Sequence, residues 1–323
     1  MDDRTTPESR SEGHVPVLMR GVLVTLDPRA GEVVADLTAG RGGHARELAA
    51  RVGASGRVVL VDADADNLAF ARERVRSHAQ DVPTEAFHAN FVDAPRLVQE
   101  AQLAADVVLA DLGYASNQID DAERGMSFRM DGPLDMRFDR TRPGATAAEL
   151  VNTLPEPELA QILWEFGEER GSRRIAQKIR EERERSPIES TAALAALVVS
   201  VLGPRGGGPK VHPATRTFQA LRIAVNDELG SLRSLLESVR RGAEASGGGG
   251  ARRAGWLAPG ARIGIIAFHS LEDRMVKRAF AELTKRKLAR SLTRTPVTAD
   301  DDETRANARS RSAKLRAIVL NDG

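Results

Sequence analysis

The sequence predicts an α/β protein with a doubly wound, mostly parallel sheet and a small all-helical domain inserted into it. Three observations support this fold class. Four successive segments in the first third of the chain combine a short apolar run with a helical pattern, an order typical of a parallel sheet covered by helices. The next convincing strand spans residues 261–268, about 150 residues later, and so long a connection must contain structure of its own. Helical patterns occupy residues 146–202 of that connection.

Composition excludes several classes of protein. The 323 residues are 41% hydrophobic and 29% charged, which is typical of a globular protein. The absence of cysteine excludes disulfides and cysteine-ligated metals, and we expect no metal site. No apolar run reaches membrane-spanning length and the N-terminus lacks a signal peptide, so we expect a cytoplasmic protein without a membrane partner. Because the net charge is only +1, any nucleic-acid surface must arise from local clustering.

The first elements lead to a glycine-rich turn. Residues 1–13 are polar and charged, and we expect a disordered arm there. Ordered structure begins at residues 14–18, continues as a helix to about Leu26, and is followed by a strand over residues 32–36. The turn of residues 38–44 then leads into a second helix. Glycine at three of these positions allows backbone N–H groups to approach a ligand and permits positive φ.

Two acidic residues narrow the choice of ligand. Gly40, Gly42 and Ala45 also satisfy the dinucleotide pattern G-x-G-x-x-G/A, so a nicotinamide enzyme is an alternative. Asp36, however, ends the first strand, where it would repel a pyrophosphate and attract a cationic amine. Asp62 ends the second strand, where a ribose-binding acid belongs. This combination suits S-adenosylmethionine, and a tight turn without a ligand is the remaining alternative.

The later strands continue the same pattern. Leu68, Ala71 and Val75 mark a helix, and strands are expected over residues 85–91 and 106–113. Ligands of a parallel sheet bind at the carboxyl ends of its strands. The polar and aromatic residues expected there are Asp36 to His44, Asp62, Asn90, Phe91 and Asp111.

The remaining elements define the domains. A capping-box pattern at residues 146–149, Pro157 and a Gly-Pro stop after Leu202 delimit the inserted helices. We place the helical domain at residues 126–212, and the sheet domain at residues 14–125 and 213–323. A flexible glycine-rich loop is expected over residues 246–250, and a last, edge strand over residues 313–320.

Asp111 is the candidate catalytic residue. The lone pair of an exocyclic amino group is delocalised into the ring, so an enzyme must hold the nitrogen in line and accept hydrogen bonds from its N–H groups. A carboxylate at the end of the fourth strand supplies such an acceptor. The alternative is that Asp111 only caps the following segment.

Further candidates for substrate binding lie in the C-terminal half. A long helix is expected to begin near His212 and to carry an apolar face with a polar stripe beside it; Arg216 and Asn226 could bind a phosphate or base edge there, or pack the helix against its domain. His269 follows the fifth strand, where it could bind a base or serve a structural role. Basic residues cluster over residues 277–294 and 305–316 and could follow a phosphate backbone.

Together these stretches resemble one family, the bacterial ribosomal RNA small-subunit methyltransferase H, which methylates N4 of a cytidine in the decoding region of 16S rRNA. The resemblance covers nearly everything from residue 14 to the C-terminus. It rests on seven motifs: residues 14–18, 40–44, 124–128, 131–137, 166–170, 212–229 and 268–274.

The resemblance implies a Rossmann-like class I methyltransferase domain interrupted by a helical one. It also implies that 16S rRNA, in the small ribosomal subunit or its precursor, is the partner. The inserted domain and the basic C-terminal segment would contact the RNA. The residues implied to bind S-adenosylmethionine are Gly42, Gly43, His44, Asp62, Phe91, Asp111 and Gln118.

Four positions depart from the family pattern, two of them adjacent. Tyr114-Ala115-Ser116 replaces the usual Val-Ser-Ser, Met126 replaces a phenylalanine, and Ala39 replaces a larger apolar residue. Tyr114 makes the motif Asp-x-x-Tyr, similar to the Asp-Pro-Pro-Tyr of amino-methylating DNA enzymes, and our hypothesis is that it stacks on the target cytosine. A ribosome-assembly factor without catalytic activity remains an alternative, as does a nicotinamide-dependent oxidoreductase.

Overall fold

The computed structural model describes residues 16–203, 212–246 and 255–321. The chain divides into two compact units, one of residues 1–113 and 231–323 and the other of residues 114–230. The domain boundaries expected at residues 126 and 212 lie inside the second unit. The expected N-terminal arm and residues 247–250 of the expected glycine-rich loop lie outside the described residues. Among the described helices, none combines the length and apolar character needed to cross a membrane.

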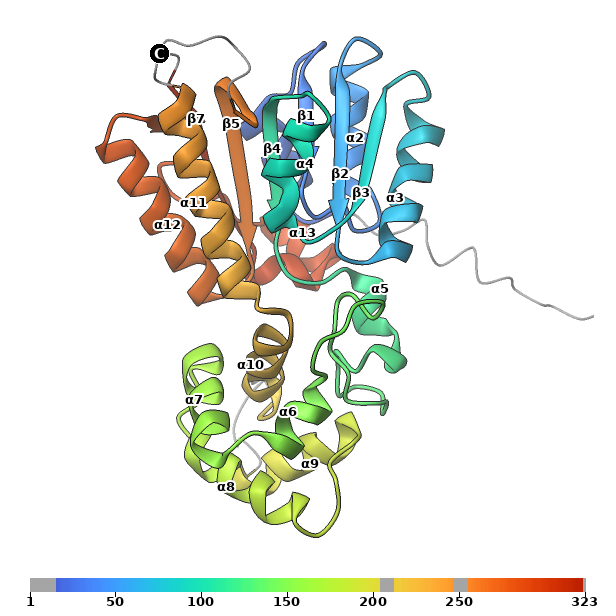
Figure 1. The fold of residues 1–323 in the computed structure, drawn as a ribbon, viewed down its shortest axis with the longest axis vertical. Coiled ribbons are helices and arrows are strands. Elements are labelled where there is room, and N and C mark those ends of the chain that lie inside the picture. The colour runs from blue at the N-terminus through green and yellow to red at the C-terminus, as the bar shows by residue number, and fades with distance from the viewer. Residues whose placement is uncertain (1–15, 204–211, 247–254, 322–323) are drawn as a thin grey trace, which may run out of the picture. The chain divides into compact units, whose positions relative to one another are not determined.

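The first unit is built on a seven-stranded sheet of order β3-β2-β1-β4-β5-β7-β6 (Figure 1). Strands β1 to β5 pair in parallel, whereas β7 is antiparallel to both β5 and β6. The α/β class and the doubly wound, mostly parallel sheet are therefore confirmed. The strands are β1 (Val33–Asp36), β2 (Arg57–Asp62), β3 (Thr84–His88), β4 (Ala105–Asp111), β5 (Leu257–Ala267), β6 (Ala289–Ser291) and β7 (Lys314–Leu320).

The last strand does not lie at the edge of the sheet. The expectation of an edge strand over residues 313–320 is wrong, because β7 lies between β5 and β6. The edge is β6, whose three residues are Ala-Arg-Ser within a basic stretch, with only Ala289 buried. So short and polar a segment has no alternation from which a strand could be predicted. Pairing with β7 alone makes it a strand.

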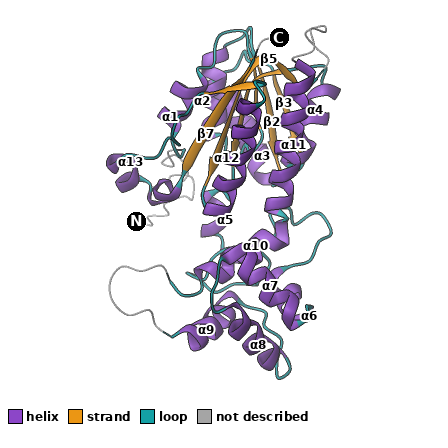
Figure 2. Cartoon of the chain, turned by 90° about the vertical axis from the view of Figure 1, so that its left-hand side faces the viewer, coloured by secondary structure: helices purple, strands orange, loops and turns teal. Residues whose placement is uncertain are grey.

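Helices cover both faces of the sheet (Figure 2). One hydrophobic core joins the sheet to α4, α11 and α12, and a second core joins it to α1, α2 and α3. Successive residues of β2 enter opposite cores, as the two-residue period of a strand requires: Val59 packs in the first and Val58 in the second. The helices are α1 (Met19–Leu26), α2 (Gly43–Val52), α3 (Ala65–His78), α4 (Ala94–Glu100), α11 (Glu228–Ser246), α12 (Ser270–Lys285) and α13 (Asp301–Ala306), with 3₁₀ turns η2 (Phe91–Asp93) and η4 (Ala308–Ser312).

Helices make up the regular elements of the second unit in the residues that the structure describes. The expected capping box begins α6, since Thr146 Oγ1 accepts from Glu149 N at 3.1 Å and Glu149 Oε2 accepts from Thr146 N at 2.7 Å. A separate core includes Leu159, Ile175 and Phe218. The helices are α5 (Ser116–Asp120), α6 (Ala147–Thr153), α7 (Glu156–Gly167), α8 (Ser172–Arg183), α9 (Thr191–Leu202) and α10 (Thr215–Asn226), with the 3₁₀ turn η3 (Ala122–Arg124).

The long helix expected from residue 212 onward is interrupted. Helix α10 ends at Asn226 and α11 begins at Glu228, because Asp227 adopts a left-handed conformation with φ of 45°. The apolar face read as continuous is thereby divided: Phe218 lies in the core of the helical unit and Leu232 in that of the sheet unit. Neither glycine nor proline marks the break.

Candidate functional site

Three parallel strands of the first unit end in an aspartate. Asp36 ends β1, Asp62 ends β2 and Asp111 ends β4. Since β1 pairs with both β2 and β4 in parallel, the three carboxylates lie at the same edge of the sheet. The turn between β1 and α2 lies at that edge too, so backbone donors and carboxylates share one region.

The glycines of the turn are required for packing as well as for access. Gly40 and Gly42 have φ of 50° and 70°, a region that favours glycine. A β-carbon on Gly42 would lie 2.8 Å from Ala71 Cα of α3, and one on Gly43 would collide with the Pro16 ring. These two glycines therefore allow α3 and the N-terminal segment to approach α2 closely.

Asp62 fixes the shape of the turn. Its Oδ2 accepts a hydrogen bond from Gly40 N at 2.7 Å, and its Oδ1 accepts one from Asp64 N at 2.8 Å. Burial raises the Asp62 pKa to about 6 despite these bonds. Each carboxylate oxygen has a second lone pair, so the group can still accept from a ligand hydroxyl.

Asp36 is buried with an unsatisfied oxygen. Its Oδ1 accepts from Thr38 N at 3.2 Å, whereas its Oδ2 has no hydrogen-bond partner among the described residues. Burial raises the Asp36 pKa to about 7, an effect that the neighbouring His44 opposes. A cationic group beside the free oxygen would stabilise the ionised carboxylate, because a buried charge without a partner is costly.

Asp111 also has a buried carboxylate oxygen without a hydrogen-bond partner among the described residues. Its backbone N donates to Thr38 Oγ1 at 2.6 Å, and its carboxylate Oδ1 is buried without a hydrogen-bond partner in the described part of the chain. Burial raises the Asp111 pKa to about 7, and the Arg309 guanidinium opposes that rise. The sequence places Thr38 in the glycine turn and Arg309 in a basic cluster, but it does not indicate that either lies beside Asp111.

His44 faces Asp111 as a neutral imidazole. Burial lowers its pKa, and its Nε2 lies 2.9 Å from Val17 O. Because a carbonyl only accepts, Nε2 must carry the proton, and Nδ1 is left as an acceptor 3.7 Å from Asp111 Oδ2. His44 therefore contributes a polar neighbour and no positive charge at neutral pH.

Phe91 lies just beyond the third strand. The strand expected over residues 85–91 spans Thr84–His88, and Phe91 opens the 3₁₀ turn η2. Asn90 caps this turn, since its Oδ1 accepts from Val92 N at 3.0 Å. Phe91 is half-buried and packs against the core formed with α4 and α11.

Two further predicted residues, Tyr114 and Gln118, belong to the helical unit. Gln118 is buried, and its Oε1 accepts from Ala115 N at 2.8 Å, which fixes the start of α5. The Arg222 guanidinium lies over the Tyr114 ring at 4.8 Å. Arg222 is itself held by Glu228 through hydrogen bonds of 2.7 and 3.0 Å.

Asn226 has a structural role in the same unit. Its Oδ1 accepts from Phe138 N at 2.8 Å, and its Nδ2 donates to Met136 O at 2.8 Å and Arg222 O at 2.9 Å. These bonds hold residues 136–138 against α10. Arg216, in contrast, is exposed and donates to Glu168 O at 3.1 Å.

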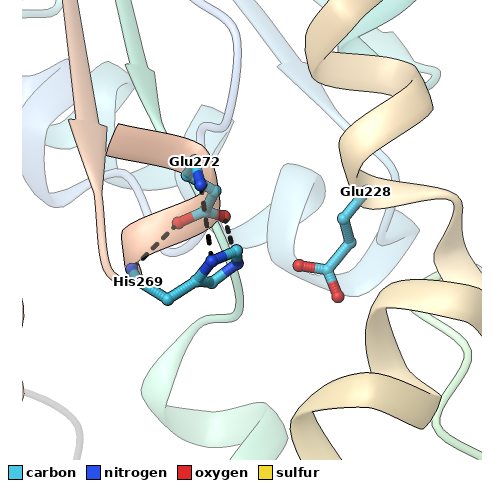
Figure 3. Close-up of side chains that lie close together, drawn as sticks. All are labelled: Glu228, His269 and Glu272. Carbon is cyan, nitrogen blue, oxygen red and sulfur yellow. Dashed lines mark hydrogen bonds and ion pairs between the residues drawn. The ribbon is translucent and has the colours of Figure 1, made fainter. Parts of the chain in front are cut away.

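His269 caps α12 (Figure 3). Its Nδ1 accepts from Glu272 N at 3.4 Å, while Glu272 Oε2 accepts from Phe268 N at 2.9 Å and from His269 N at 3.3 Å. The imidazole Nε2 lies 3.2 Å from Glu272 Oε1. These contacts support the structural interpretation of His269.

The fold and these carboxylates define the class of protein. The sheet is doubly wound, a glycine turn follows β1, and three strands end in an aspartate. Asp36 and Asp111 each keep a buried oxygen without a hydrogen-bond partner among the described residues. This arrangement fits a ligand that carries an amine and hydroxyls. These are features of a Rossmann-like S-adenosylmethionine-dependent methyltransferase. The chain belongs to the MraW methylase family, which it matches over residues 11–320. The expected cofactor, S-adenosylmethionine, is confirmed by this membership.

Similar proteins span nearly the same length. A protein of Sorangium cellulosum named ribosomal RNA small subunit methyltransferase H is 46% identical over 313 residues, covering 96% of this chain and 92% of its own. A Symbiobacterium thermophilum protein of the same name is 42% identical over 322 residues, covering 95% and 96%. Among solved structures, a SAM-dependent methyltransferase from Aquifex aeolicus has a TM-score of 0.38 and 10% identity, covering 94% of this chain and 90% of its own.

Proposed function

We propose that this protein methylates N4 of a cytidine in the decoding region of 16S rRNA, in the small ribosomal subunit or its precursor. The relatives' name supports the rRNA substrate, and the motifs quoted above support the cytidine amine. The observation that carries the proposal is the buried, unsatisfied Oδ1 of Asp111 at the end of β4. It offers a hydrogen-bond acceptor where this class of sheet binds its ligands.

The cofactor supplies an electrophilic methyl group on a sulfonium. Asp36 would accept hydrogen bonds from its ammonium group through Oδ2, and Asp62 would accept from its ribose hydroxyls. Gly42, Gly43 and His44 would line the turn beside it, and Phe91 would contact the adenine from the start of η2. Gln118 stays a proposed cofactor contact because the family resemblance implies it.

Asp111 would act on the amino group. Its ionised carboxylate accepts a hydrogen bond from an N–H of the cytosine amine and so holds the nitrogen lone pair in line with the methyl group. A charge-assisted hydrogen bond contributes about 1.5–3 kcal/mol, equivalent to about a ten- to hundredfold change in rate. With a pKa of about 7, the carboxylate can also take the proton that the amine loses after methylation.

Tyr114 would stack on the target cytosine. It follows Asp111 by three residues, and Arg222, fixed by Glu228, holds the ring from one side. Tyr114→Phe keeps the ring and should retain turnover and RNA affinity, whereas Tyr114→Val should lower both. Unchanged turnover and affinity in Tyr114→Val would exclude the stacking role.

The test is methyl transfer from labelled S-adenosylmethionine to small-subunit particles, followed by nucleoside analysis of the 16S rRNA. Wild-type protein should produce labelled N4-methylcytidine, and Asp111→Asn should produce it far more slowly with the fold intact. RNA binding without any transfer would instead indicate an assembly factor. Wild-type turnover in Asp111→Asn would remove Asp111 from the mechanism.

A further inference from the structure

A cluster of three arginines and an exposed phenylalanine adjoins the cofactor turn. Its members are Arg41 within the turn, Arg46 on α2, and Phe70 and Arg74 on α3. We propose that these four side chains form a binding surface for single-stranded RNA, with the guanidinium groups contacting phosphates and the Arg41–Phe70 pair supporting an unstacked base. The proposal rests on the proposed RNA substrate and names where the strand would contact the first unit.

The glycine turn brings the four side chains of this surface close together. Since Gly42 has no β-carbon, its backbone approaches Ala71 of α3. Phe70 and Arg74 lie next to Ala71 and one turn beyond it on that helix. The Arg41 guanidinium consequently lies over the Phe70 ring, 3.8 Å from its centroid, and Arg74 Nη1 donates to Arg41 O at 3.3 Å.

The cluster carries an excess of positive charge. Burial lowers the Arg74 pKa, and the nearby Arg46 and Arg41 lower it further, whereas Glu47 opposes the shift. Glu47 already pairs with Arg46 at 2.9 Å, so one acid faces three guanidinium groups. Bound phosphates would relieve this repulsion, as they do where arginines cluster on nucleic-acid-binding proteins.

Phe70 gives the surface an aromatic component. Its side chain is 37% exposed, which is uncommon for a phenylalanine, and the Arg41 guanidinium covers its ring. Proteins that bind unpaired RNA stack bases on aromatic rings and on guanidinium planes. A guanidinium held over a ring presents its outer face to a base while its N–H groups reach a phosphate. The combination favours a single strand over a duplex, whose bases are already stacked.

The same helix provides a control. Arg76 lies two residues after Arg74, and it forms two hydrogen bonds of 2.9 Å with Glu73. Arg76→Gln removes one positive charge from α3 outside the cluster. The test variants are the double variant Arg46→Gln/Arg74→Gln, which removes two guanidinium groups, and Phe70→Ala, which removes the ring. None of these residues is assigned to the cofactor site.

The measurement is the affinity of each full-length variant for a single-stranded RNA of about 12 nucleotides, and for small-subunit particles, across a salt series. Each lost phosphate contact should reduce the slope of log affinity against log salt by about 0.7 for a single strand. The double variant should therefore lose about 1.4 of slope and bind at least fivefold more weakly. Phe70→Ala should weaken binding without changing the slope, and Arg76→Gln should match the wild type. Cofactor affinity should remain at the wild-type value in all three variants, which shows that each is folded, whereas the unfolding midpoint of Phe70→Ala should fall because the buried part of its ring is lost.

The outcomes separate this proposal from the proposed function. If wild-type protein transfers methyl groups and the double variant keeps its affinity and salt slope, the surface is overturned and the function stands. If the variants lose RNA affinity as expected but the wild type transfers no methyl group, the surface stands and the function fails. Equal affinity for a duplex of the same length would overturn the single-strand assignment, and absence of RNA binding by the wild type would overturn both.

Discussion

Cofactor binding should release a proton from Asp36. The Asp36 carboxyl is buried with a pKa of about 7, and its Oδ2 lacks a hydrogen-bond partner among the described residues. A bound ammonium group favours the ionised form, so the pKa falls when the cofactor binds. The ionisable groups that influence Asp36 are His44, Asp111 and Asp62, and His44 is neutral because burial lowers its pKa.

The size of the effect follows from the pKa. With a value of about 7, about nine-tenths of the Asp36 carboxyls are protonated at pH 6, about half at pH 7 and about a tenth at pH 8. If binding lowers the pKa well below 6, about 0.5 proton is released per cofactor at pH 7. Because only the ionised Asp36 carboxylate binds the ammonium group, the affinity for the cofactor is greatest above the pKa of Asp36 in the cofactor-free protein. It is lost as pH falls through that pKa. Affinity should be about tenfold lower at pH 6 than at pH 8.

The assay is titration calorimetry in buffers of different ionisation enthalpy, repeated between pH 6 and pH 8. The slope of apparent enthalpy against buffer ionisation enthalpy gives the number of protons released. Asp36→Asn should bind more weakly at pH 8 and lose most of the release. The control is Asp81→Asn, which removes an exposed carboxylate that is not among the groups influencing Asp36 and should leave the release in place. Asp111→Asn should reduce the release at pH 7, because the Asp111 charge helps to raise the Asp36 pKa.

Two results would refute this reasoning. Wild-type protein that binds the cofactor with the same affinity at pH 6 and pH 8 would show that no buried carboxyl changes its ionisation on binding. Unchanged proton release in Asp36→Asn would assign the titration to another group.

Three further predictions follow from the contacts. Asp111→Asn should slow methyl transfer about ten- to hundredfold at pH 8. The wild-type rate should fall as pH drops through about 7, since the ionised carboxylate is the active form. A transfer rate that changes neither with this substitution nor with pH would contradict the acceptor role. Gly42→Ala should lower the free energy of unfolding by about 2–3 kcal/mol, because its β-carbon meets Ala71. Gly31→Ala, also at positive φ but with only an ordinary contact to Ser55, should cost about 1 kcal/mol. Equal midpoints in urea would exclude the packing explanation. Asn226→Ala should lower the free energy of unfolding by about 2–3 kcal/mol, because it leaves the backbone N of Phe138 and O of Met136 unpaired. A variant with full stability but weak RNA binding would restore a substrate role for Asn226.

Sequence patterns predict a helix or strand correctly where neighbouring residues along the chain determine its structure. The continuous apolar run within Arg57–Asp62 and the Thr146–Glu149 capping box predict their elements correctly, because each depends on residues a few positions apart. The parallel topology then places Asp36 and Asp111 at one edge of the sheet without knowledge of any contact.

Features that depend on distant partners were not predictable. The Asn226 amide binds residues 136–138, almost 90 positions earlier. Because the sequence does not show this contact, the polar stripe of α10 that includes Asn226 resembles a ligand-binding face. Similarly, β6 exists only because β7 pairs with it. The break at Asp227 has no sequence signal, since aspartate is uncommon but tolerated at positive φ.

The sequence also carries a signal for the start of α12. His269 stands three residues before Glu272, which is the spacing of a capping box with histidine in place of serine or threonine. That spacing could have indicated the helix start. Arg309, in contrast, could not be linked to Asp111 from the sequence, because almost 200 residues separate them and η4 has no helical pattern of its own.

The most direct test of the central claim is mass mapping of 16S rRNA nucleosides from cells with and without this protein. We expect one cytidine of the decoding region to carry an N4-methyl group in the first case and to lack it in the second, with the modification restored by the wild-type chain and not by Asp111→Asn. An unchanged modification in cells without the protein would contradict the account.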